Sequence, residues 1–205
     1  MSHYAVLVIG DNPEMQLEPF DENLSVEPYL LGEVTDMTKQ RMLDYYNKLH
    51  NNKYTTFDEC YAENGDDWDG NRCQRDEDGV WYEYSTYNPN SKWDWYSLGG
   101  RWSGRFIKLK EGASGTIGFP SLVCENKAGV DQAYKSDIDF EKINKKNFIP
   151  YAVLYEGEWI SRGDMGWWGI TLTDHYTDEE WEAKVWELID QTEDDTLFSF
   201  YDLHI

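Results

Sequence analysis

Two short apolar runs constrain the fold more than any other feature of this sequence. The run YAVLVI, Tyr4–Ile9, is continuous, contains β-branched residues and ends at Gly10, which is typical of a buried central strand. Its first four letters recur as YAVL at Tyr151–Leu154. Each copy precedes a helical pattern and then a later strand pattern, which is the plan of a ferredoxin-like sandwich. The sequence therefore predicts an α+β fold with an antiparallel or mixed sheet and two main helices.

Capping residues and apolar spacing place the two helices. The first is predicted to begin near Thr35 or Asp36, either of which could cap it, and to end at Asn51-Asn52. Its apolar positions at helical spacing are Met42, Tyr45, Tyr46 and Leu49. The second begins at the capping box Thr177–Glu180, because a threonine is followed three residues later by a glutamate. Its apolar stripe is Trp181, Val185, Leu188 and Ile189.

Further strands are predicted at Val80–Thr86, Arg101–Leu109 and Thr196–His204, and two more around the turn Glu156-Gly157 within Ile149–Ile160. The proline-containing segment Pro13–Leu31 is expected to be an extended loop. Residues 52–79 are polar and acidic without a clear period. We therefore expect one domain over residues 1–205 with a loop-rich acidic insertion at 52–79.

The predicted topology brings together residues from the first and last strands. In a ferredoxin-like sheet these strands pair antiparallel, so His3 would lie near Asp202 and His204. The last two share one face because they are two apart on a strand. The group could act as a metal site or as an acid–base pair. We take it as the candidate catalytic group.

Charge restricts the partners of the chain. Forty acids against 18 bases give a net charge of −22 and a calculated isoelectric point of about 4.3. Such a chain repels nucleic acid and anionic membranes, so we expect no direct nucleic-acid binding, and attraction to proteins with a basic surface. Ten acids lie in Asp58–Glu83 and ten in Asp174–Asp195, whereas Arg101–Lys146 has nine bases and six acids. Solubility alone is the alternative explanation of the charge.

The compartment follows from cysteine usage and hydropathy. Cys60, Cys73 and Cys124 form no CxxC pair, which favours a reducing environment. No signal-peptide pattern opens the sequence, and no stretch approaches 18 apolar residues. We expect a cytoplasmic protein without membrane contact.

The segment Asn88–Phe106, NPNSKWDWYSLGGRWSGRF, concentrates aromatic residues, glycines and charges. Indoles offer flat faces, arginine offers a planar fork for carboxylate or phosphate, and paired glycines allow close backbone approach. This combination is typical of an aromatic pocket with a charged anchor, although closure of a second small core would also explain it. The candidate ligand- or partner-binding residues here are Lys92, Trp93, Asp94, Trp95, Tyr96, Gly99, Gly100, Arg101 and Trp102.

Two other loops join this prediction. The segment GDMGWWG, Gly163–Gly169, carries adjacent Trp167 and Trp168, which cannot both face one core in an extended chain. The segment PFDEN contributes Asp21 and Asn23. Acidic turns at 66–71 and 76–79 lack the spacing of calcium loops, and the common nucleotide-binding and hydrolase motifs do not occur. We therefore expect no cofactor and no resident metal.

Five blocks resemble a family of uncharacterised bacteriophage-encoded proteins: SHYAVLVIG at Ser2–Gly10, PFDEN at Pro19–Asn23, NPNSKWDWYSLGGRWSG at Asn88–Gly104, DMGWWG at Asp164–Gly169 and DDTLFSFYDLHI at Asp194–Ile205. They cover about a third of the chain. In that family a cysteine commonly precedes the penultimate histidine, where this chain has Leu203. The resemblance implies a viral or prophage origin and a setting in the cytoplasm of an infected bacterium. It implies no activity.

Three functions fit these observations. The first is an accessory protein for host takeover or counter-defence that inhibits a basic host protein through its acidic surfaces. The second is a protein that binds a small nucleotide-like ligand between its tryptophans and arginine, and sequesters or processes it. The third is a minor virion component. Oligomeric state and the presence of an enzymatic activity stay open at this point.

Overall fold

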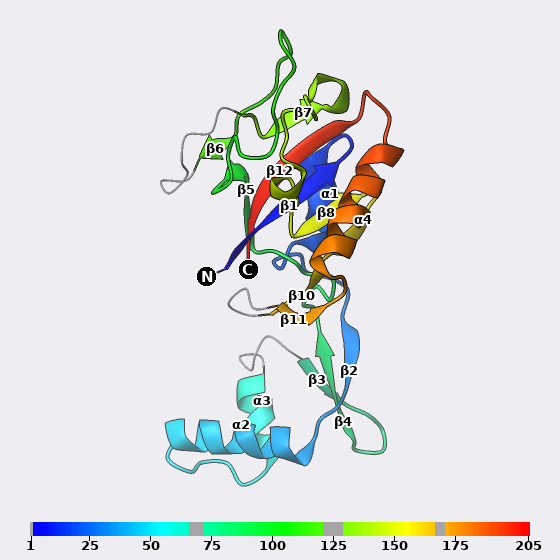
Figure 1. The fold of residues 1–205 in the computed structure, drawn as a ribbon. Coiled ribbons are helices and arrows are strands. Elements are labelled where there is room, and N and C mark those ends of the chain that lie inside the picture. The colour runs from blue at the N-terminus through cyan, green and yellow to red at the C-terminus, as the bar shows by residue number, and fades with distance from the viewer. Residues whose placement is uncertain (1, 66–71, 121–128, 167–170) are drawn as a thin grey trace. The chain divides into compact units, whose positions relative to one another are not determined.

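The computed structural model describes residues 2–65, 72–120, 129–166 and 171–205. They form two compact units (Figure 1). Unit 1 combines Met1–Glu22 with Asn90–Ile205, and unit 2 is Asn23–Pro89. Each unit has its own sheet and its own apolar core.

The sheet of unit 1 is centred on β1 (His3–Ile9) and β12 (Leu197–His204). These strands run antiparallel in a register that places His3 opposite His204. On the far side of β1, β8 (Ala152–Tyr155) runs parallel and forms a hairpin with β9 (Glu158–Ser161). Positive φ angles of 52° at Glu156 and 79° at Gly157 form the tight turn between them, as the sequence predicts.

The other side of β12 pairs with two further strands. There β5 (Trp95–Gly100) pairs antiparallel with the end of β12, and β7 (Gln132–Tyr134) pairs with its start. The edge strand β6 (Phe119–Pro120) lies parallel to β5. Outside this sheet, β10 (Gly163–Met165) and β11 (Thr171–Asp174) form a separate ribbon, and short 3-10 turns occur at Glu18–Phe20, Lys135–Asp137 and Lys145–Asn147.

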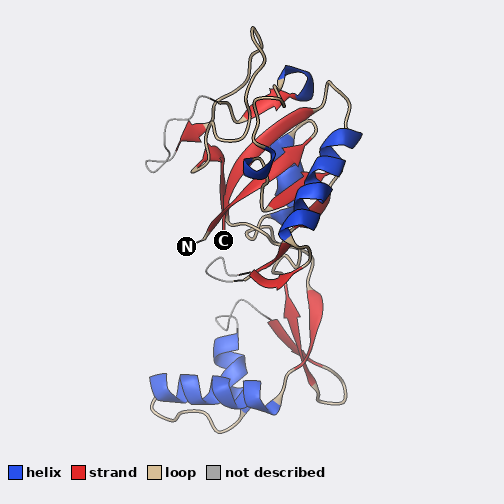
Figure 2. Ribbon diagram, in the orientation of Figure 1, coloured by secondary structure: helices blue, strands red, loops and turns tan. Residues whose placement is uncertain are grey.

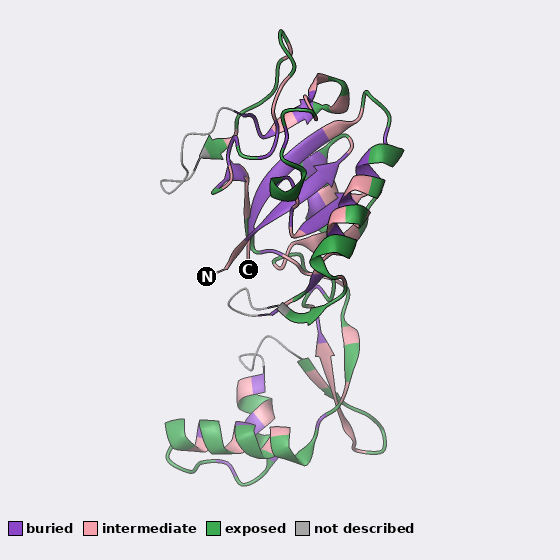
Figure 3. Cartoon of the chain, viewed as in Figure 1, coloured by how far each residue is buried: buried purple, intermediate pink, exposed green. Residues whose placement is uncertain are grey.

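Side chains alternate along β1, so successive residues point to opposite faces of the sheet. Both faces are covered by other elements of unit 1. Leu7 and Ile9 belong to the core beneath α4 (Asp178–Gln191), which lies across the sheet in Figure 2. Val6 and Val8 belong to the opposite core, with Leu17 of α1 (Pro13–Leu17). Figure 3 shows the central strands almost entirely buried.

Helix α4 forms where the capping box predicts it. Thr177 Oγ1 accepts the Glu180 N–H, and the Glu180 carboxylate accepts the Thr177 N–H, which lowers the pKa of Glu180. The predicted stripe is buried: Trp181, Val185, Leu188 and Ile189. At the other end, Lys135 Nζ donates to the carbonyls of Ile189 and Thr192, at 2.9 and 2.5 Å, and the N–H and Oγ1 of Thr192 also donate to Ile189.

Unit 2 is built from a three-stranded antiparallel sheet and two helices. The strands β2 (Tyr29–Glu33), β4 (Trp81–Ser85) and β3 (Arg72–Arg75) lie in that order. Thr35 caps α2 (Asp36–Leu49) as predicted, but of its apolar stripe Met42 and Tyr46 are buried while Tyr45 and Leu49 are exposed. Thr56 and Glu59 form a capping box for α3 (Phe57–Asn64).

The division into units differs from the expected single domain with a loop-rich insertion at 52–79. Within that segment, α3 and β3 contribute to a core that contains Phe57 and Cys60, both packed near Met42 of α2. The apolar residues of α3 are interleaved with acids, which hid their helical spacing in the sequence.

The predicted α+β class with a mixed sheet is confirmed. The ferredoxin-like arrangement differs, because that plan has a main helix in each β-α-β crossover. Here the path from β1 to β8 passes through α1, β5 and all of unit 2, and α2 belongs to unit 2. No helix in the described ranges is both long and apolar enough to cross a bilayer.

Two local predictions are wrong. Pro13–Leu31 contains α1, a 3-10 turn and β2 rather than only extended loop, because Pro13 and Pro19 occupy first turns, where proline is tolerated. Arg101–Leu109 forms turns and isolated bridges, and the strand in this region is β5. Gly99, Gly100 and Gly104 have φ angles of 76°, 48° and 67°, which turn the chain away from the sheet after β5.

Candidate functional site: two histidine–aspartate pairs on three strands

Three neighbouring strands of unit 1 bring the candidate catalytic group together. The β1–β12 register sets His3 opposite His204, and the β12–β5 register sets His204 opposite Trp95. The Asp94 N–H donates to the His204 carbonyl at 3.0 Å, which extends this pairing by one residue. The predicted proximity of His3, Asp202 and His204 is therefore present, and Trp95 of β5 and the preceding residue, Asp94, join this group.

The first pair is His3 with Asp202. His3 Nδ1 lies 2.8 Å from Asp202 Oδ1, and Asp202 is only 1% exposed. The second carboxylate oxygen, Oδ2, accepts the Arg101 N–H at 2.9 Å. Both oxygens of this buried carboxylate thus have donors, which offsets the cost of removing it from water.

The second pair is His204 with Asp94. His204 Nδ1 lies 2.5 Å from Asp94 Oδ1, and the two imidazole rings are 5.0 Å apart between centroids, at 69° to each other. His204 Nε2 is buried and has no hydrogen-bond partner among the described residues. The two pairs therefore contact each other edge to face.

The carboxylates determine which nitrogen of each ring carries the proton. An ionised carboxylate can only accept hydrogen bonds, so Nδ1 of His3 and of His204 must donate. In the neutral ring this leaves Nε2 with a lone pair. A carboxylate that holds a histidine in this tautomer is the arrangement that prepares an imidazole to accept a proton.

Trp95 and Arg101 border the first pair. The Trp95 ring lies 6.2 Å from the His3 ring, and the residue is 52% exposed although it belongs to a sheet strand. Arg101 is exposed, while its backbone N–H is fixed on Asp202. Chemically, this part of unit 1 offers a base beside a flat aromatic surface, and the backbone of Arg101 is held on the carboxylate that contacts this base.

The paired glycines serve two buried carboxylates. A β-carbon on Gly100 would lie 2.3 Å from Asp202 Cβ, and one on Gly99 would lie 2.3 Å from Asp131 Oδ2. Asp131 is 1% exposed and accepts from Ser103 Oγ at 2.7 Å, from the Gly104 N–H at 2.6 Å and from the Gly118 N–H at 2.8 Å. The turn after β5 is therefore held on Asp202 and Asp131.

Sequence reasoning missed Asp131 as the anchor of this turn. Its signal is a single acid in the largely uncharged stretch AGVDQAY, where a solvated acid is less expected than one with a buried role. Asp94, predicted as a ligand- or partner-binding residue, contacts His204.

The other aromatic candidates belong mainly to the core. Trp93 is 6% exposed, and its Nε1 donates to the Leu17 carbonyl at 3.1 Å. Tyr96 packs edge to face on Trp93, at 4.9 Å, and burial raises its pKa. Trp102 packs against the core beneath α4. Trp93 and Tyr96 therefore pack in one core of unit 1 and Trp102 in the other. For these three residues, packing in a core was the alternative explanation of the segment Asn88–Phe106.

The remaining candidates are separate from the histidine pairs or outside the described residues. Lys92 lines a small cavity of about 90 Å³ with Tyr4 and Trp159. Asp21 forms a bridge with Trp93 in unit 1, whereas Asn23 belongs to unit 2. Trp167 and Trp168 lie outside the described residues.

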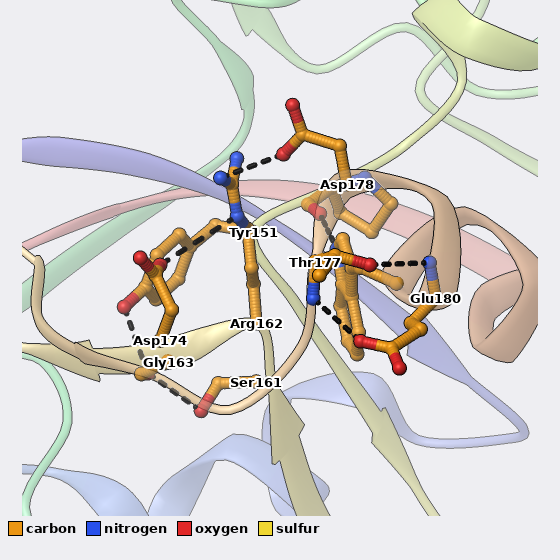
Figure 4. A network of polar contacts seen from close by, with 10 residues as sticks. Tyr151, Ser161, Arg162, Gly163, Asp174, Thr177, Asp178 and Glu180 are labelled. Carbon is orange, nitrogen blue, oxygen red and sulfur yellow. Dashed lines mark hydrogen bonds and ion pairs between the residues drawn. The ribbon is translucent and has the colours of Figure 1, made fainter.

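A second polar network fixes the start of α4 (Figure 4). Arg162 contacts Asp178 at 2.7 Å and Asp174 at 3.9 Å, and Tyr151 Oη donates to the Gly163 carbonyl. The network borders an open groove of about 580 Å³ that also includes Trp181. Arg162 therefore already has carboxylate partners on the border of this groove.

The acidic window at 174–195 forms an exposed surface along α4 and its flanks. Of its ten acids, nine are exposed and Glu182 is partly buried. Its one base, Lys184, contacts Glu187 at 3.3 Å. The buried stripe explains this arrangement, because an amphipathic helix presents its polar residues to solvent.

Metal-binding chemistry was the other possibility for the histidines. Within the described ranges, no three histidine, cysteine, aspartate or glutamate side chains are grouped so that they could hold a metal ion. Comparison with protein-family models, with curated proteins and with solved structures finds no significant match to this chain.

Replacing Gly100 with alanine tests the close approach of Asp202. We expect Gly100→Ala to destabilise the protein by about 1–3 kcal/mol more than Gly112→Ala, the usual cost of overpacking. Gly112 is the matched control because it also has a positive φ, 81°, but nothing lies within 4 Å of the added carbon. Urea denaturation at pH 7 measures both. Equal losses would show that Asp202 does not require the glycine.

Proposed function

We propose that unit 1 binds a small nucleotide-like ligand beside the His3–Asp202 pair, and that His3 accepts a proton from it. The observation that carries this proposal is the contact of His3 Nδ1 with a buried, fully paired carboxylate, next to a half-exposed tryptophan. Exposed tryptophan is costly in water and suits stacking on a nucleobase.

Each residue would have a distinct role. The Trp95 ring would stack on the base, and Arg101 would meet an anionic group. His3 Nε2 would take a proton from a ligand hydroxyl, and Asp202 would stabilise the imidazolium that results. Because His204 Nε2 is covered, His204 would act through its contact with the His3 ring, as a positioning residue held by Asp94.

Substitution of Trp95 tests the binding step. We expect at least one nucleoside monophosphate to bind in calorimetric titrations, and Trp95→Leu to weaken that binding about tenfold or more, since stacking contributes about 1–3 kcal/mol per base. Tyr134→Leu is the matched control, because Tyr134 is also half-exposed, at 48%, on strand β7 of the same unit. Absence of binding by any nucleotide, or equal weakening by both substitutions, would refute the site.

Substitution of His3 tests the proton transfer separately from binding. We expect His3→Gln to keep nucleotide binding within a few-fold and to abolish any conversion that mass spectrometry detects with wild type. His175→Gln should leave conversion unchanged, because His175 is an exposed histidine that contacts a different carboxylate, Asp164, at 3.1 Å. If the wild-type protein binds the nucleotide but does not convert it, the function is limited to sequestration, and the role of His3 as a base is contradicted.

A second function is favoured by the exposed acids of 174–195: inhibition of a basic host protein, as a phage accessory factor would do. We expect a variant with Glu179→Gln, Glu187→Gln and Asp190→Asn to lose salt-sensitive partners from a bacterial lysate. A control with Glu27→Gln, Glu33→Gln and Asp44→Asn removes the same charge from exposed positions of unit 2. Partners that survive high salt, or that both variants lose equally, would contradict this function.

A further inference from the structure

A small pocket in unit 1 gathers positive charge in a chain whose net charge is −22. The pocket measures about 170 Å³ and lies between residues 105–108 and residues 142–148. Among the described residues, its lining includes three cations and no carboxylate. The cations are Arg105, Lys108 and Lys142. Three of the bases that give segment 101–146 its positive charge therefore lie around one pocket.

Backbone contacts fix the two walls of the pocket relative to each other. The Asp139 N–H donates to the Lys108 carbonyl at 2.7 Å, and Leu109 forms an isolated bridge with Ile138. Beneath the cations, the rings of Phe106 and Phe148 are 5% and 1% exposed. The pocket thus has a rigid aromatic floor and a cationic rim.

The cations keep unused hydrogen-bonding capacity. Lys108 Nζ donates to the Gly104 carbonyl at 3.1 Å, which uses one of its three donors. The Arg105 guanidinium lies 5.5 Å from the Phe106 ring centroid and has no hydrogen-bond or ion-pair partner within the described part of the chain. Its planar fork is therefore available to a ligand.

One carboxylate competes for the third cation. Lys142 Nζ contacts Asp139 Oδ2 at 2.6 Å, and this hydrogen bond lowers the pKa of Asp139. The Lys142 side chain is 64% exposed and that of Asp139 is 16% exposed, so the ammonium group stays in contact with water and can exchange this carboxylate for another anion. Two neutral amides, from Asn144 and Asn147, complete the polar lining.

We propose that this pocket binds a phosphate group, free or as the ester of a small metabolite. Three converging cations with open donors match the charge and the acceptor oxygens of a phosphate. The volume of about 170 Å³ is below the 300–1,000 Å³ of pockets for drug-sized ligands, so one phosphate with a small substituent fits best. This inference does not depend on the nucleotide site at His3.

Titration with inorganic phosphate, followed by 31P NMR at constant ionic strength, tests the inference. We expect saturable binding by wild type, and a loss of about tenfold or more in affinity for Arg105→Gln and for Lys142→Gln, as for any lost hydrogen bond to a charged group. Arg41→Gln is the matched control, because Arg41 is exposed on α2 of unit 2 and the charge change is the same. Ribose 5-phosphate, titrated in parallel, distinguishes an ester from free phosphate by its higher affinity.

A substitution that should raise the affinity for phosphate provides a test that misfolding cannot imitate. Asp139→Asn removes the competing carboxylate, so we expect it to strengthen phosphate binding several-fold while thermal unfolding shows a folded protein. No saturable binding by wild type would overturn the inference. Equal weakening by Arg41→Gln would also overturn it, because the effect would then come from net charge alone.

Discussion

The antiparallel pairing of β1 with β12 is the interaction on which the rest of unit 1 depends. It occupies the middle of the sheet, and its seven paired positions run from His3–His204 to Ile9–Phe198. Because side chains alternate, one register decides which residues meet α4 and which meet α1, and a shift by one residue would exchange the two faces. Each apolar side chain buried in this way contributes about 1.5–3 kcal/mol. The same register places His3, Asp202 and His204 together, so the candidate site is a direct consequence of core packing.

Two buried carboxylates impose the second constraint. Asp202 and Asp131 are each 1% exposed, and an ionised group at such depth is tolerated only when its oxygens are paired. Backbone N–H groups from Arg101, Gly104 and Gly118 supply much of that pairing. Backbone can approach this closely only where no β-carbon intervenes, which explains Gly99 and Gly100. The aromatic motif is therefore partly a structural device, with Trp95 as its exposed member.

The sequence allowed prediction of features that depend on local pattern. The β8–β9 turn and the α4 capping box follow from residues within short windows, whereas the pairing of the first and last strands, and with it the meeting of His3 with Asp202, was expected from a ferredoxin-like topology. Other features that depend on distant partners were missed. The strand of this region was predicted at Arg101–Leu109 rather than at β5, and Trp93 could be assigned to the core only once Leu17 was placed beside it. Asp131 had only a weak local signal, because its donors come from three separate positions.

Unit 1 has an acidic surface along α4 and a cationic pocket around Phe106 and Phe148, and the two suit ligands of opposite charge. On α4, buried apolar residues force the acids outward, so this surface repels anionic ligands and attracts cationic proteins. The cations Arg105, Lys108 and Lys142 instead line a concave pocket that also includes Phe106 and Phe148. The net negative charge of the chain repels an anion at long range, although the pocket itself is cationic. Short-range hydrogen bonds must therefore supply the selectivity of the pocket. Such a pocket would discriminate by geometry rather than by charge alone, which favours a small, well-defined oxyanion over a polyanion.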